Sequence, residues 1–122
     1  MPHVDVFFFQ EDEYRVPLLQ WLDDLPAMAR RKCLARLQRL GELGHLLRRP
    51  EADYLRDDIY EPRASCQGVH YRMLYFFHGR LAVVVSHGIV KERAVPPREI
   101  DLAVKRKKSF ESDPDKHGFQ GR

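Results

Sequence analysis

Apolar residues in the first part of the chain change from a strand-like to a helix-like spacing. Residues 4–9 (VDVFFF) are β-branched and aromatic, which is typical of a β-strand. Pro17 suits the first turn of a helix, where a missing N–H does no harm. A second helix is predicted over Ala27–Leu43, after Pro26 ends the first. The apolar residues of the first helix lie at helical spacing: Leu18, Trp21, Leu22 and Leu25.

The second predicted helix has one apolar and one basic face. Because the linker before it is short, the two helices should form an antiparallel hairpin. The basic residues Arg31, Lys32 and Arg39 either contact RNA or simply form the charged outer surface that amphipathic helices normally have. The apolar face holds Ala29, Cys33, Leu34, Leu37 and Leu40.

Strand-like segments dominate the second half of the chain. Residues 59–63 (IYEPR) predict a short strand, in which Pro62 favours an edge position or a bulge. Residues 69–77 and 81–87 predict two longer strands, and the three residues between them, including a glycine, predict a hairpin loop.

The C-terminal region lacks the strand-like pattern. Pro96 and Pro97 end the strand region, and residues 98–104 predict a short helix. From Lys105 onward the sequence is basic and then polar, which predicts a flexible tail over residues 105–122. The 122 residues are enough for one domain, expected over residues 1–104.

This element order predicts an α+β fold. Strands joined by short hairpins indicate a small, mainly antiparallel sheet, and the helical hairpin should cover one of its faces. A short helix follows the last strand.

Strand alternation assigns side chains to the two faces of the long hairpin. His70 and Arg72 point away from the helices, on the same side as Ser86, Leu74 and Phe76. The same register places His87 on the side that the helices cover. The other face, which should pack on the helices, holds Val69, Tyr71, Met73, Tyr75, Phe77, Leu81, Val83 and Val85.

Composition adds little to this picture. The chain has 21 Lys and Arg against 18 Asp and Glu, a net charge of +3, so a nucleic-acid partner is no more favoured than an ordinary basic surface. Cys33 and Cys66 have no CxxC partner and predict neither a disulfide nor a metal site. No apolar run is long enough to span a bilayer and no signal peptide is recognisable, so a cytoplasmic location without a membrane partner is expected.

Arg72 is the most informative residue for chemistry. It lies within a strand of large apolar and aromatic residues, where a guanidinium is costly unless the face is open or an anion binds it. Arg63 and Lys91 flank the same region in sequence, so a small cationic site for a phosphate is predicted. The alternative is a structural ion pair of Arg72 with Glu61 or Asp58.

Four segments resemble the phage-derived branch of the RelE/HigB toxin superfamily. Residues 54–63 (YLRDDIYEPR), 68–76 (GVHYRMLYF) and 86–92 (SHGIVKE) are similar to three strand motifs of that family. Pro96, Glu99, Ile100 and Ala103 fit its Pro-x-x-Glu-Ile-x-x-Ala ending.

The resemblance implies a RelE-like fold and the toxin of a type II toxin–antitoxin pair. Such a toxin is an endoribonuclease that cleaves mRNA, usually on the ribosome, without a metal or other cofactor. Its partner is a cognate antitoxin, often a helix-turn-helix protein. Two residues depart from the motifs: Pro62 replaces a leucine and Glu92 replaces a lysine, and no C-terminal tyrosine is present to serve as an acid.

Cleavage by the 2′-OH of RNA needs charge stabilisation and proton transfer. We assign Arg72 to the scissile phosphate, Arg63 and Lys91 to phosphate binding, and Lys91 also to proton donation. His87 is the candidate acid–base group because histidine titrates near neutral pH, and His70 is the alternative on the open face. The expected RNA-binding residues are Arg63, Arg72, Lys91, Arg93, Tyr60 and His70.

Two other functions stay open. The departures at Pro62 and Glu92 favour a weak or inactive toxin-like domain that binds an antitoxin-type regulator. A third interpretation is a phage-derived component that binds RNA without cutting it.

Overall fold

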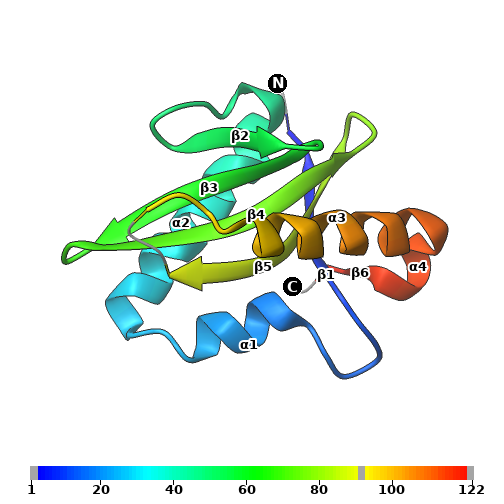
Figure 1. Cartoon of the computed structure of the whole chain (residues 1–122), viewed down its shortest axis with the longest axis horizontal. Helices are drawn as coiled ribbons and strands as arrows, with labels where there is room; N and C mark the ends of the chain where they lie inside the picture. The colour runs from blue at the N-terminus through cyan, green and yellow to red at the C-terminus, as the bar shows by residue number, and fades with distance from the viewer. Residues whose placement is uncertain (1–2, 91–92, 121–122) are drawn as a thin grey trace.

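The computed structural model describes residues 3–90 and 93–120. A six-stranded sheet runs through the middle of the molecule, with α2 behind it and α3 in front in Figure 1. Helix α1 packs together with α2 on one face of the sheet, and α3 packs on the other. The predicted α+β class is confirmed. The helices are α1 (Pro17–Asp23), α2 (Ala27–Leu43), the 3₁₀ turn η1 (Gly44–Leu46), α3 (Pro97–Ser112) and α4 (Pro114–His117).

The sheet has the strand order β2-β3-β4-β5-β1-β6. Strand β1 pairs with β5 in parallel, and every other neighbouring pair is antiparallel. The parallel pair is possible because α1, α2 and three strands separate β1 from β5 in the chain. The strands are β1 (Asp5–Phe9), β2 (Ala52–Arg56), β3 (Ile59–Cys66), β4 (Val69–His78), β5 (Ala82–Val90) and β6 (Gly118–Phe119).

Two tight turns connect β2, β3 and β4. Asp57 and Asp58 have φ angles of 52° and 65°, and Gln67 and Gly68 have φ angles of 52° and 80°. Two successive residues with positive φ form the turn whose twist matches a two-residue β-hairpin. The second turn is much shorter than the gap expected over residues 64–68, so β3 and β4 pair almost to their ends.

The helical hairpin packs on the face predicted for it. Buried residues of α1 and α2 contact Tyr71, Met73 and Tyr75 of β4 and Val83 and Val85 of β5. The predicted bounds of α2 are confirmed, whereas two residues expected in this core are not there. Leu34 is half exposed on α2, and Leu81 is exposed because it lies in the turn before β5.

The opposite face of the sheet is covered by α3. Leu74, Phe76 and Val84 are buried there against Ile100 and Ala103. This second core explains why a strand with apolar residues on both faces is stable in the sheet.

The predicted C-terminal tail differs from the structure. Helix α3 continues to Ser112, and α4 and β6 follow it, with β6 pairing to β1. Phe110 is buried against Phe76 and holds the helix past Val104, while His117 stacks on Phe9 with 5.1 Å between ring centroids. Few apolar residues lie in this segment, and the prediction gave too little weight to Phe110.

Strand β2 was also absent from the sequence-based prediction. Its sequence, ADYLR, has no strong strand signal, but the turn at Asp57–Asp58 pairs it with β3. The pairing ends with Ala52 opposite Pro62. Pro62 is therefore paired and buried, not at an edge as predicted, and β3 forms the edge of the sheet only beyond Arg63, whose backbone N–H still donates to Glu51 O.

Within the described residues, no helix combines the length and the apolar composition needed to cross a lipid bilayer.

Candidate functional site

Arg63 and Arg72 lie directly opposite one another on β3 and β4. Both bind Glu61: Arg63 Nε lies 2.9 Å from Glu61 Oε2, and Arg72 Nη1 lies 3.4 Å from each carboxylate oxygen. Glu61 is completely buried and the Arg72 side chain is 13% exposed. The structural pair of Arg72 with Glu61 is thus present, and it brings the two arginines together.

A second carboxylate extends this network toward the loop before β2. Asp53 Oδ2 lies 3.1 Å from Arg63 Nη2 and 3.0 Å from Arg49 Nη2. The hydrogen bond from Arg49, helped by Arg63, holds the pKa of Asp53 below its ordinary value. Arg72 Nε is buried without a hydrogen-bond partner among the described residues. This N–H is thus an unsatisfied buried donor within the arginine pair.

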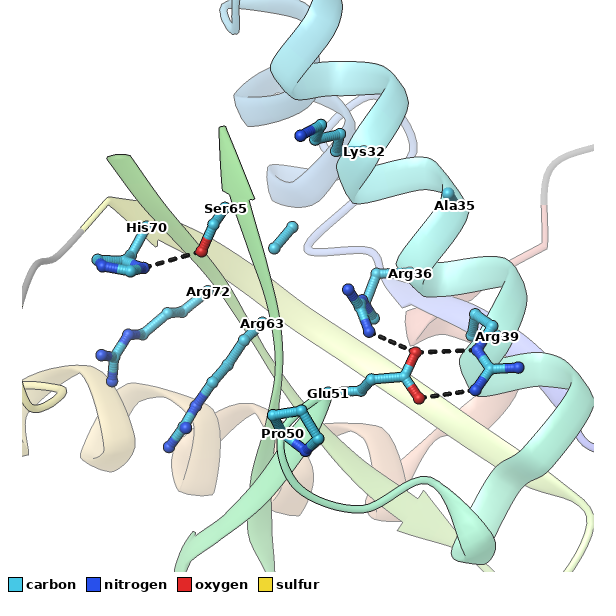
Figure 2. A pocket seen from close by; sticks show the side chains of 11 residues that line it. Lys32, Ala35, Arg36, Arg39, Pro50, Glu51, Arg63, Ser65, His70 and Arg72 are labelled. Carbon is cyan, nitrogen blue, oxygen red and sulfur yellow. Dashed lines mark hydrogen bonds and ion pairs between the residues drawn. The ribbon is translucent and has the colours of Figure 1, made fainter. Parts of the chain in front are cut away.

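A basic groove of about 710 Å³ passes along the exposed edge of β3. Figure 2 shows α2 on one side of β3, carrying Lys32, Arg36 and Arg39, and the side chains of Arg63 and Arg72 on the other. The three α2 residues recur at spacings of four and three, so they share one side of the helix. Arg31, the neighbour of Lys32 in sequence, does not line the groove.

Of the described residues that line this groove, Glu51 is the one carboxylate. Arg39 binds it through two hydrogen bonds and Arg36 through a third (Figure 2). The hydrogen bonds from Arg39 lower the pKa of Glu51, so it stays ionised at neutral pH. One negative charge therefore fixes two guanidinium groups in place while five cationic side chains line the groove.

His70 lies at the end of the same groove. Its Nδ1 is 2.9 Å from the Ser65 hydroxyl, and the side chain is exposed (Figure 2). This hydrogen bond fixes the ring and leaves Nε2 directed away from Ser65. The His70 imidazole is therefore within reach of a ligand in the groove.

His87 lies on a different face of the sheet from the one predicted. Leu74 pairs with His87 but Tyr75 pairs with Val85, so Ser86 is an extra residue in β5. This bulge reverses the alternation and turns His87 toward α3, on the side of Arg72. A bulge of this kind leaves no signal in a sequence of alternating apolar residues.

His87 is buried and has little contact with solvent. The residue is 7% exposed, its Nδ1 lies 2.7 Å from the Ser86 hydroxyl, and its Nε2 lies 3.0 Å from Glu99 Oε1. Burial lowers the pKa of His87; Arg106 acts in the same direction and Glu99 opposes it. Both ring nitrogens are occupied, and the imidazole joins β5 to α3.

The other expected RNA-binding residues are more dispersed. Arg93 is exposed in the segment before α3. Tyr60 lies on the face of the helical hairpin, stacked near Tyr75, and so points away from Arg72. Lys91 and Glu92 lie outside the described residues. The structure therefore brings together Arg63, Arg72 and His70 of the predicted set.

The sequence-based prediction missed Arg36 as a groove residue and left Lys32 and Arg39 undecided. Their spacing along α2 was visible, but the packing of that side of the helix beside the β3 edge was not. Among the described residues, no group of three or more His, Cys, Asp or Glu side chains is arranged to hold a metal ion.

A comparison with models of known protein families gives a match for this chain. Residues 20–108 match the family of phage derived proteins described as Gp49-like (DUF891). The chain belongs to this family. The match extends from α1 to Lys108 in α3 and so includes every residue of the basic groove. The Gp49-like family is associated with RelE/HigB-like toxins of toxin–antitoxin systems. No curated protein matches the chain.

Proposed function

We propose that this Gp49-like protein is the toxin of a type II toxin–antitoxin pair and an endoribonuclease that cleaves mRNA without a metal ion. The proposal includes a RelE-like architecture, supported by the helical hairpin on one face of the sheet. It also includes ribosome-bound mRNA as the substrate, and therefore action in the cytoplasm. The partner is a cognate antitoxin.

One observation carries this proposal. Lys32, Arg36 and Arg39 of α2 and Arg63 and Arg72 of the sheet line a single groove, although up to 40 residues separate them in the chain (Figure 2). Phosphate contacts supply most of the affinity of proteins for nucleic-acid strands. A groove with five cations and one carboxylate, itself bound to two of them, suits an RNA backbone.

The arginine pair suits the chemistry at one phosphate. The 2′-OH attacks the neighbouring phosphorus, the bond to the 5′-oxygen breaks, and extra negative charge develops on the non-bridging oxygens. We assign Arg72 to these oxygens because its fork of N–H donors matches them. Arg63, beside it, adds a second positive charge.

Proton transfer is assigned to His70. The sequence favoured His87, but both ring nitrogens of His87 are hydrogen-bonded and its side chain is buried. His70 lines the groove, and Ser65 orients its ring. In its neutral form it can accept the proton of the 2′-OH, and in its charged form it can donate one to the leaving 5′-oxygen. Lys91 remains a proposed phosphate-binding residue.

Inducible expression in a bacterial host tests the toxin assignment. The wild-type chain should arrest growth, and co-expression of the neighbouring reading frame should restore it. Arg72→Lys, which keeps the charge but loses the fork, should abolish arrest at an equal level of folded protein. Arg98→Lys, at an exposed arginine at the start of α3, should arrest growth like the wild type. Equal arrest by all three chains would exclude Arg72 from the active site.

The ion pairs favour one alternative. Glu61 and Asp53 already bind Arg63, and Glu61 also binds Arg72, so both arginines have anionic partners within the protein. In an inactive toxin-like domain that binds an antitoxin-type regulator, these internal ion pairs would be the only role of the two arginines. Recovery of a DNA-binding partner by affinity purification, together with intact RNA after induction, would select this alternative.

A further inference from the structure

A second cavity lies on the helical-hairpin face of the sheet, between η1, β2 and the ends of β3 and β4. It has a volume of about 540 Å³ and lies beside the basic groove. None of the aromatic residues around it belongs to the proposed catalytic site. Five aromatic side chains line it: His45, Tyr54, Tyr60, Tyr75 and Phe77.

The rings are already arranged in stacking and edge-to-face pairs. His45 and Phe77 stack with 3.6 Å between centroids, and Tyr60 and Tyr75 stack with 5.5 Å between centroids. Tyr54 meets Tyr60 edge-on, with centroids 5.1 Å apart. Rings held in this way lose little conformational entropy when another flat ring packs on them.

A buried phenol supplies the polar group of the cavity. Tyr75 is 1% exposed and lines the cavity. Burial, with a contribution from Tyr60, raises the pKa of Tyr75, so the phenol stays neutral and can donate.

Cations at the edge of this cavity connect it to the groove. Arg48 and Arg49 line the cavity, while Pro50 and Glu51, next in sequence, line the basic groove. Asp53 binds Arg49 of the cavity and Arg63 of the groove with the same carboxylate oxygen. One short segment of chain therefore separates an aromatic cavity from a phosphate-binding surface.

We propose that this aromatic pocket binds one unpaired nucleobase of the RNA strand whose backbone lies in the basic groove. The inference rests on the proposed function and adds a base-binding subsite to it. The exposed rings of His45 and Tyr54 pack on the base, the Tyr75 hydroxyl bonds to its polar edge, and Arg48 and Arg49 bind the adjoining phosphate. An uncharged aliphatic ligand would gain little from two arginines beside the rings.

Fluorescence anisotropy with two probes tests the inference in the full-length chain. One probe is a short fluorescein-labelled single-stranded RNA, and the other is a ribose-phosphate chain of the same length without bases. His45→Ala and Tyr54→Ala should each weaken binding of the RNA by about tenfold and leave binding of the abasic chain unchanged. Both side chains are exposed, so the fold should persist. Tyr14→Ala, at a tyrosine 89% exposed near another cavity, is the matched control.

A third variant addresses the buried hydroxyl. Tyr75→Phe keeps the ring and the packing and should weaken RNA binding by severalfold, again without effect on the abasic chain. Lys32→Glu in the groove should weaken binding of both probes. Aromatic variants that bind RNA like the wild type, or that lose both probes equally, would overturn the base subsite. Failure of Lys32→Glu to weaken either probe would instead contradict the RNA-binding function.

Discussion

Arg63 and Arg72 face each other across β3 and β4, and the buried carboxylate of Glu61 binds both guanidinium groups. Two cations of like charge are held next to each other because one desolvated anion lies between them. A phosphate at the groove would be a second anion on the outer side of the same pair. For the proposed function, the arginine pair is thus preorganised to bind an anion.

Removing the Glu61 charge should destabilise the protein. We expect Glu61→Gln to lower the free energy of unfolding by about 3 kcal/mol, because two partly buried guanidinium groups lose a shared partner. Urea unfolding measures this effect. Glu42→Gln, at an exposed carboxylate on α2, should change stability by less than about 0.5 kcal/mol. Similar small changes in both variants would show that Glu61 does not hold the arginine pair.

The basic groove predicts a difference between two neighbouring cations of α2. Lys32 lines the groove and Arg31 does not. Lys32→Gln should weaken binding of single-stranded RNA and reduce the slope of log affinity against log salt by about 0.7, since one fewer phosphate is neutralised. Arg31→Gln should leave the slope unchanged. A salt titration followed by anisotropy gives both slopes, and equal slopes would place the RNA elsewhere.

Gly88 lies under the indole of Trp21. A Cβ at this position would come within 2.3 Å of Trp21 Cε3, a contact that the rigid ring cannot relieve by itself. We expect Gly88→Ala to lower the free energy of unfolding by about 2 kcal/mol. In a Trp21→Leu background the same substitution should cost much less. A double-mutant cycle in urea tests this, and an unchanged penalty would mean that the indole is not the obstacle.

His87 should make stability fall on acidification. Burial lowers the pKa of His87 below the ordinary value of 6.5. The charge of Arg106 lowers this pKa further, and Glu99 raises it in part. Above pH 6.5 His87 is neutral in both states and its contribution is fully present. Below that pH the unfolded chain binds a proton that the folded chain does not, so the free energy of unfolding decreases until the folded-state pKa is reached.

Two variants separate this effect from other titrations. His87→Gln, which keeps a hydrogen-bonding side chain, should flatten the dependence of the unfolding free energy on pH just below 6.5. Glu99→Gln removes the carboxylate that stabilises the charged imidazole, so the pKa of His87 should fall further. The dependence of the unfolding free energy on pH should then become steeper in this range. Identical pH profiles for wild type and both variants would contradict the account of His87.

Much of the fold could be predicted because local patterns and tertiary packing agree. The apolar spacing over Ala27–Leu43 gave the bounds of α2, and strand alternation gave the helix-facing side of β4. Strand β2 could not be predicted because its pairing depends on a turn at Asp57–Asp58. The extension of α3 depends on a single buried aromatic residue, Phe110.

The site was predicted less completely, for a physical reason. Arg72 stood out because a guanidinium among apolar strand residues needs an anion or solvent. The face of the sheet on which His87 lies depends on an extra residue in β5, at Ser86. No sequence pattern indicates that bulge. The contribution of α2 depends on how a helix packs beside a sheet edge, which is a property of the tertiary structure alone.

The most direct test of the central claim is the chemistry of the RNA ends formed after induction. Attack by the 2′-OH at a phosphate bound by Arg72 leaves a 5′-hydroxyl on the downstream fragment. Ligation-based mapping of 5′-hydroxyl ends should therefore show new mRNA termini with the wild-type chain and with Arg31→Gln, and none with Arg72→Lys. The absence of new 5′-hydroxyl ends when the folded wild-type chain accumulates, or identical ends with Arg72→Lys, would contradict the account.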